Sequence, residues 1–126
     1  MLSAILVIDD DKNQRNSLRF ALEDRGFQVE LAASGQEALE LAKKARFDAA
    51  ICDIMMPGLD GLETLRALRQ EQPWLEVVMA TGYGTSQSAL KALKLGACHY
   101  LTKPYELQDL VDILNQALGR SRAPGP

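Results

Sequence analysis

The sequence predicts an α/β fold in which five parallel strands form an open, doubly wound sheet with helices on both faces. Two observations lead to this fold. Five short apolar runs recur along the 126 residues, and each is followed after a short connection by a segment in which apolar residues have helical spacing. Five such units are also too few for a closed α/β barrel, which needs eight. A chain of this length is expected to form one domain.

The predicted strands are residues 4–8, 27–31, 49–52, 75–80 and 98–101. The run AAIC at 49–52 stands before a Pro57-Gly58 turn signal and is typical of a parallel strand that is covered on both faces. The run FQVEL at 27–31 alternates apolar and polar residues, which indicates an edge or half-buried strand.

Local signals mark where the helices begin and end. Three pairs have the spacing of a capping box and precede helical patterns: Asp11 with Gln14, Ser34 with Glu37, and Asp60 with Glu63. Three glycines follow helical patterns and are expected to end helices: Gly26, Gly96 and Gly119. The helix at 86–95 is predicted to turn Leu90 and Leu93 inward, and the last helix is predicted at 107–118.

The composition argues against several function classes. Lys+Arg number 14 against 17 Asp+Glu, for a net charge of −3, so the basic excess that marks nucleic-acid binding is missing. No apolar run is long enough for a signal sequence or a membrane span, and we expect a cytoplasmic protein without membrane contact. Cys52 and Cys98 are predicted to be reduced core residues, and His99 is expected to be structural because it lacks the partners of a catalytic or metal-binding histidine. We expect one domain at 1–120 and a disordered tail at 121–126.

Polar residues stand where the apolar runs end. Asp9 and Asp10 follow the first run, Asp53 the third, Thr81 the fourth and Lys103 the fifth. With strand order 2-1-3-4-5, strands one and three are neighbours, so the three carboxylates should meet at the edge where open α/β sheets bind ligands. A lone Asp beside a Pro-Gly turn would be interpreted as a turn former or helix cap, but capping does not explain five such residues.

Three carboxylates held close together need a compensating cation. Carboxylates with room for water suit Mg²⁺, with the backbone carbonyl of Met55 as a candidate further ligand. A carboxylate beside Mg²⁺ and a lysine is a competent nucleophile toward phosphorus, so Asp53 is the predicted phosphoacceptor. Lys103 and Thr81 would each donate a hydrogen bond to an oxygen of the transferred phosphoryl group.

Four segments in order, ILVIDDD, CDIMMPGLDG, VVMATGYG and YLTKPY, resemble the signatures of response-regulator receiver domains of two-component signal transduction. The resemblance covers residues 5–118 and implies the flavodoxin-like (βα)5 receiver fold. It further implies that Asp10 and Asp53 bind Mg²⁺ directly, that Asp9 assists through a water molecule, and that Asp53 takes phosphate from a histidine kinase or phosphotransfer protein.

In this family a threonine and an aromatic residue form a switch, and the matching residues here are Thr81 and Tyr100. The resemblance implies that phosphorylation remodels the surface formed by residues 86–118, which a downstream effector reads. It also implies a cis peptide bond at Lys103-Pro104, and a signalling switch that catalyses only its own phosphorylation and dephosphorylation. Exposed charges could pair across a homodimer through this surface, or form a solvated face: Lys91, Lys94, Asp109 and Asp112.

Two other interpretations belong to different function classes. A phosphate-ester enzyme working through an aspartyl phosphate would carry its nucleophile and acid two residues apart at the first strand, whereas Asp53 follows the third strand and has no acid two residues on. Turnover of a phosphate ester would decide between them. A degenerate receiver that only binds partners would lack acceptor residues, all of which are present here.

Overall fold

The computed structural model describes residues 2–54, 60–82 and 84–119. Its five strands are β1 (Ala4–Ile8), β2 (Gln28–Ala32), β3 (Ala49–Cys52), β4 (Glu76–Thr81) and β5 (His99–Thr102). All neighbouring strands are parallel, and their order is β2-β1-β3-β4-β5. The predicted doubly wound sheet and its strand order are therefore confirmed.

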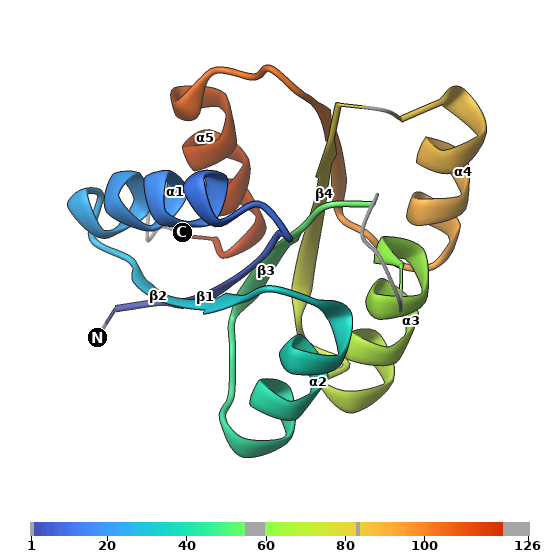
Figure 1. Cartoon of the computed structure of the whole chain (residues 1–126), viewed down its shortest axis with the longest axis horizontal. Helices are drawn as coiled ribbons and strands as arrows, with labels where there is room; N and C mark the ends of the chain where they lie inside the picture. Colours follow the sequence, from blue (N-terminus) through green and yellow to red (C-terminus); the bar gives the residue numbers. More distant parts are fainter. Residues whose placement is uncertain (1, 55–59, 83, 120–126) are drawn as a thin grey trace.

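Helices cover both faces of the sheet (Figure 1). They are α1 (Lys12–Asp24), α2 (Gly35–Lys44), α3 (Gly61–Glu71), α4 (Ser86–Lys94) and α5 (Leu107–Ala117). Residues Ile5 and Val7 of β1 pack in a core with α1 and α5, while Leu6 and Ile8 pack in a second core with α2, α3 and α4. Because side chains alternate between the two faces, a strand covered on both sides is apolar throughout.

Side chains cap most of the helices as the sequence indicates. The side chains of Asp11, Ser34 and Asp60 each accept a backbone N–H from the first turn of the helix that follows. The capping box predicted for Asp11 and Gln14 is only half present. The Gln14 side chain accepts a hydrogen bond from Lys103 and not from the backbone N–H of Asp11. This contact places Gln14 at the functional site.

Two predictions about burial are wrong. In α4, Leu90 and Leu93 are 58% and 48% exposed, and Ala92 is the buried residue. The helix turns small residues toward the sheet, so its large apolar residues lie on the outer side. Cys98 is exposed because it precedes the edge strand β5, whereas Cys52 is buried as predicted.

Strand boundaries also differ slightly from the sequence prediction. Strands β2, β4 and β5 each begin and end one residue later than predicted, since pairing with neighbouring strands extends to Ala32, Thr81 and Thr102. Met55 and the tail at 121–126 lie outside the described residues. No helix in the described ranges combines the length and apolar character needed to cross a membrane.

Candidate functional site

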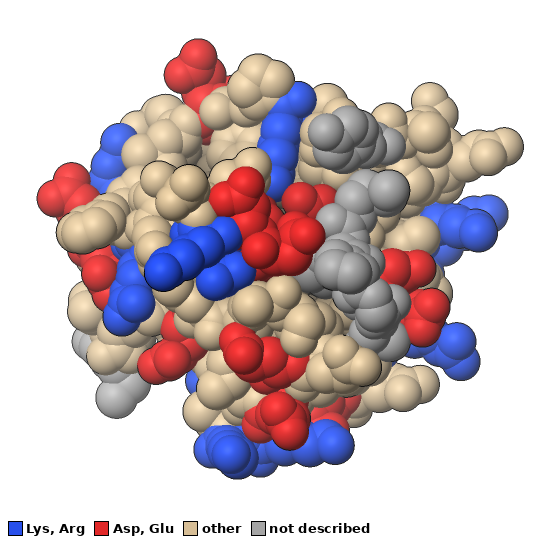
Figure 2. All heavy atoms as spheres, in the orientation of Figure 1, with Lys and Arg blue, Asp and Glu red and all other residues tan. Residues whose placement is uncertain are grey.

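The carboxyl ends of β1 and β3 bring three aspartates together. Because β1 and β3 are hydrogen-bonded neighbours, the Asp53 amide donates to the carbonyl of Ile8 at 3.1 Å and lies beside Asp9. One carboxylate oxygen from each of Asp9, Asp10 and Asp53 lies within 4.8 Å of the other two. Figure 2 shows acidic side chains gathered at the centre of this face beside atoms of Lys and Arg. The predicted acidic cluster is therefore present.

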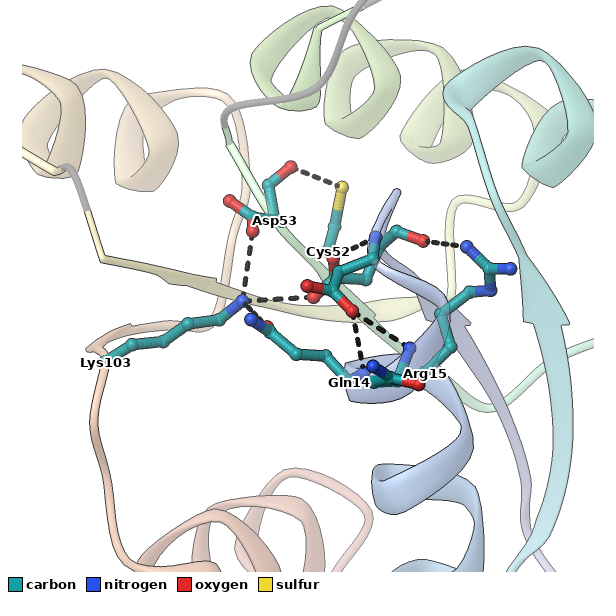
Figure 3. A network of polar contacts seen from close by, with 8 residues as sticks. Gln14, Arg15, Cys52, Asp53 and Lys103 are labelled. Atoms are coloured by element: carbon teal, nitrogen blue, oxygen red, sulfur yellow. Dashed lines mark hydrogen bonds and ion pairs between the residues drawn. The ribbon is translucent and has the colours of Figure 1, made fainter.

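Lys103 joins the aspartates from the end of β5. Its Nζ donates to Asp9 Oδ2 and Asp53 Oδ2, each at 3.0 Å, and to Gln14 Oε1 at 2.5 Å. Figure 3 shows Asp53, Lys103 and Gln14 pointing toward one another from three different elements. The Asp53 side chain is only 12% exposed, so this charge is compensated within the protein rather than by bulk water.

The charge on Lys103 is stabilised by its partners. Burial by itself lowers the pKa of Lys103, but the hydrogen bonds and negative charges of Asp9 and Asp53 outweigh it and raise the pKa above its ordinary value. Lys103 therefore remains an ammonium at neutral pH. Its backbone N–H also donates to the Thr81 carbonyl at 2.9 Å, which fixes the lysine to the end of β4.

Backbone contacts fix the position of the aspartates. The Asp9 carbonyl accepts a hydrogen bond from Arg15 Nη1 at 2.9 Å, and Asp9 Oδ1 accepts the Asp11 N–H at 2.9 Å. A Cβ atom on Gly61 would lie 2.2 Å from the carbonyl oxygen of Asp53, so only glycine allows α3 to begin this close to the acceptor. The sequence patterns did not assign Arg15, Gln14 or Gly61 to the site. Only Gly61, directly after a predicted cap, carried a local signal.

Cys52 lies beneath the cluster without taking part in it. Its Sγ donates to the backbone carbonyl of Asp53 at 3.4 Å. Burial raises the pKa of this thiol, and the charges of Asp53 and Asp9 raise it further, so Cys52 stays protonated. The prediction of a reduced core residue is confirmed for this cysteine.

The two predicted switch residues lie on the neighbouring strands β4 and β5. Thr81 is buried at the end of β4, and Tyr100 is half-buried on the neighbouring strand β5. The Tyr100 hydroxyl lies 3.1 Å from Ser88 Oγ of α4. Tyr100 thus connects β5 to the first turn of α4.

A cavity of about 800 Å³ opens beside the cluster, between α1 and α5. Asp9, Asp53 and Lys103 lie along its wall, together with apolar residues such as Leu18 and Leu107. Asp9 and Asp53 can thus be reached through this cavity. Their all-oxygen donor set, with one cation already present, fits a hard divalent metal and a small anion.

Comparisons with known proteins agree on one family. The family model of the response regulator receiver domain matches residues 5–115. A response regulator, MprA, from Mycolicibacterium vanbaalenii is 42% identical over 117 residues, which are 93% of this chain and 51% of that protein. The transcriptional regulatory protein ZraR from Klebsiella oxytoca is 39% identical over 118 residues, 94% of this chain and 27% of that protein. The chain thus spans about half the length of MprA and about a quarter of the length of ZraR.

Solved structures are similar over nearly the whole chain. A CheY-like receiver domain protein from Methanospirillum hungatei superposes with a TM-score of 0.91 at 32% identity, covering 94% of this chain and 95% of the other. A response regulator from Burkholderia pseudomallei has a TM-score of 0.86 at 32% identity, covering 93% of this chain and 69% of the other. That structure contains a phosphorylated aspartic acid, a calcium ion and citrate.

Proposed function

The chain belongs to the response regulator receiver domains of two-component signal transduction, and on this premise we propose that Asp53 accepts a phosphoryl group and so switches the surface formed by α4, β5 and α5. The observation that carries the proposal is the position of Asp53, at the carboxyl end of β3, between the aspartates of β1 and the ammonium of Lys103. The phosphorylated aspartate of the similar Burkholderia protein supports it.

The acidic cluster is proposed to hold Mg²⁺. Asp10 and Asp53 would bind the ion directly, Asp9 through a water molecule, and the backbone carbonyl of Met55 would add a ligand. Carboxylate oxygens within 4.8 Å of one another fit a hard divalent ion, and the calcium ion in the Burkholderia structure supports divalent binding in the family. The ion supplies positive charge that offsets the charge of the phosphoryl group and of the carboxylates.

The proposed chemistry is transfer of one phosphoryl group from phosphohistidine. A carboxylate oxygen of Asp53 attacks phosphorus and forms the new P–O bond, while the P–N bond breaks and the donor imidazole leaves and takes up a proton. Lys103, already hydrogen-bonded to Asp53, would donate to one phosphoryl oxygen, and the Thr81 hydroxyl to another. The domain would catalyse only this reaction and its own dephosphorylation, and would not be a turnover enzyme.

The signal is proposed to leave the site through Thr81 and Tyr100. A phosphoryl group can shift the conformational equilibrium only if its contacts differ between the two states, and the Thr81 hydroxyl supplies such a contact. The expected partners are a cognate histidine kinase or phosphotransfer protein and an effector, either a linked domain or a separate protein. We further propose a cytoplasmic location and a homodimer through α4, β5 and α5, with no direct binding of nucleic acid.

Mass spectrometry tests the acceptor. A small phosphodonor such as acetyl phosphate, given with Mg²⁺, should add one phosphoryl group to the intact protein, and treatment with EDTA should prevent the addition. Asp53→Asn should abolish it. Asp60→Asn is the matched control, since asparagine also caps helices and Asp60 serves as the cap of α3. Equal labelling of Asp53→Asn and the parent would show that the acceptor lies elsewhere.

Amide chemical shifts test the switch. Beryllofluoride, which mimics the phosphoryl group, should shift resonances in residues 85–115 as well as those next to the aspartates. The Tyr100→Ala variant should keep the shifts near Asp53 and lose those in α4. Changes confined to the loops around the aspartates would contradict the relay. Sustained hydrolysis of a phosphate ester would favour the enzyme interpretation instead.

A further inference from the structure

We propose that Gly84 and Ser88 form a seat for the Tyr100 side chain, and that through this seat the first turn of α4 follows the position of Tyr100. The proposal rests on the proposed role of Tyr100 in signalling and adds the two residues that hold its ring. They come from the segment between β4 and α4 and from the first turn of α4, respectively.

Gly84 contributes space. A Cβ atom built on Gly84 would lie 1.6 Å from the Tyr100 hydroxyl oxygen and 2.8 Å from Cζ of the same ring. It would also lie 2.8 Å from Cγ2 of Thr81. The end of the tyrosine therefore occupies volume that the side chain of any other residue at position 84 would fill, and the buried Thr81 bounds the same volume.

Ser88 contributes the hydrogen-bond partner. Its Oγ donates to the Thr85 carbonyl at 2.9 Å and accepts the Thr85 N–H at 2.9 Å, which closes the capping box of α4. The Tyr100 hydroxyl lies 3.1 Å from the same Oγ, within hydrogen-bond distance, and either hydroxyl can be the donor. One hydroxyl thus serves both the helix cap and the tyrosine.

The seat links strand β5 to the first turn of α4. Tyr100 is on β5, and Ser88 precedes Ala92, the one buried residue of α4, by one helical turn. When Tyr100 leaves the seat, the cap loses a partner and the space beside Thr81 opens. The position of the ring is therefore transmitted directly to the N-terminus of α4.

The first test locates the ring by NMR, with and without beryllofluoride. The parent should show nuclear Overhauser contacts from the Tyr100 ring to the protons of Gly84 and Ser88 in at least one of the two conditions. Gly84→Ala should abolish the contact to Ser88. The control is Gly82→Ala in the same segment, because the nearest atom to a Cβ there is Lys103 Cβ at 3.8 Å, an ordinary contact. Ser88→Ala should weaken the contact and Ser88→Thr, which keeps the hydroxyl, should restore it. A Tyr100–Ser88 contact that survives Gly84→Ala overturns the proposal.

The second test separates lost space from backbone strain. Gly84→Ala should lower the midpoint of urea unfolding in the parent, and the fall should vanish in a Tyr100→Ala background, where the ring is absent. If Gly84→Ala lowered the unfolding midpoint equally in both backgrounds, the glycine would be needed for the backbone conformation and not for the space of the ring. The proposal would then be wrong. The ring contact measured without beryllofluoride does not depend on phosphorylation. Phosphoryl labelling of Asp53, measured separately by mass spectrometry, therefore shows independently whether the proposed phosphoacceptor function fails.

Discussion

Repulsion among the three aspartates should lower the free energy of unfolding of the metal-free protein. The structure indicates which aspartate contributes most to this loss of stability. Lys103 forms ion pairs with Asp9 and Asp53 at 3.0 Å, whereas Asp10 has no ion pair among the described residues. Neutralising Asp10 therefore removes repulsion without breaking an ion pair, while neutralising Asp53 removes repulsion and also the ion pair with Lys103. We predict that Asp10→Asn stabilises the metal-free protein more than Asp53→Asn does.

The distances set the size of the effect. Two unit charges 4.8 Å apart repel by about 3.5 kcal/mol at an effective dielectric near 20, and a pair at 3.0 Å attracts by about 5.5 kcal/mol. For Asp53, two repulsions are therefore largely offset by Lys103. Asp10 is exposed, which weakens its repulsions, and its place before α1 returns about 0.5 kcal/mol through the helix dipole. We expect Asp10→Asn to stabilise the metal-free fold by about 1–2 kcal/mol and Asp53→Asn by less.

Urea unfolding in EDTA measures both differences, with fluorescence of Trp74 as the signal. Trp74 is the single tryptophan, and its indole N–H donates to the Phe47 carbonyl at 3.0 Å in the folded state. Glu30→Gln on the exposed side of β2 is the control for overall charge. With saturating Mg²⁺ the parent should become more stable than Asp10→Asn, because the ion binds the native cluster of the parent and Asp10→Asn loses a ligand. If Asp10→Asn in EDTA were no more stable than the parent, the carboxylates would not be a repulsive cluster.

Three further predictions concern other parts of the molecule. Lys103→Ala should keep the Mg²⁺-induced rise in melting temperature but lose the beryllofluoride-induced shifts in α4; loss of the metal response as well would contradict separate roles. Although Cys98 is an exposed residue, neighbouring atoms partly shield its thiol from water, and this desolvation and then the charge of Glu76 raise the pKa of Cys98 to about 11. Iodoacetamide at pH 8 should therefore modify this thiol far more slowly than free cysteine, and Glu76→Gln should accelerate the reaction. A rate equal to that of free cysteine would contradict the raised pKa. Gln72→Ala should lower the free energy of unfolding in urea by about 2–4 kcal/mol. The reason is that the buried Gln72 side chain donates to two backbone carbonyls and accepts one backbone N–H near the end of α2. A loss under about 1 kcal/mol would contradict this role.

The sequence predicted the site well where chemistry and topology coincide. Asp9, Asp10 and Asp53 stand at the ends of apolar runs, and a parallel sheet places such ends at one edge, so their meeting needed only the strand order. Lys103 followed from the same rule. These predictions depend on the backbone, whose course follows from the periodicity of apolar residues over many positions.

The contacts that the sequence did not reveal depend on how a helix is rotated. Gln14 looked like part of a capping box, yet its side chain reaches Lys103 on the far side of the site. Arg15 reaches back to the Asp9 carbonyl from the same helical turn. A long polar side chain on a helix has several partners within reach, and only the packed structure decides among them.

The rotation of α4, which turns Leu90 and Leu93 outward and not inward as predicted, bears on the proposed function. An inward leucine would bury much more apolar surface than Ala92 does, and burial contributes roughly 25 cal/mol per Å². Because Ala92 is the buried residue of α4, apolar burial holds this helix less strongly than an inward leucine would, and contacts of its first turn add to the attachment. The Ser88–Tyr100 hydrogen bond is one of these contacts. Removing one contact changes the position of a helix most when little else holds the helix in place. If Tyr100 switches as proposed, the same outward leucines that misled the sequence prediction leave α4 free to respond to the position of its ring.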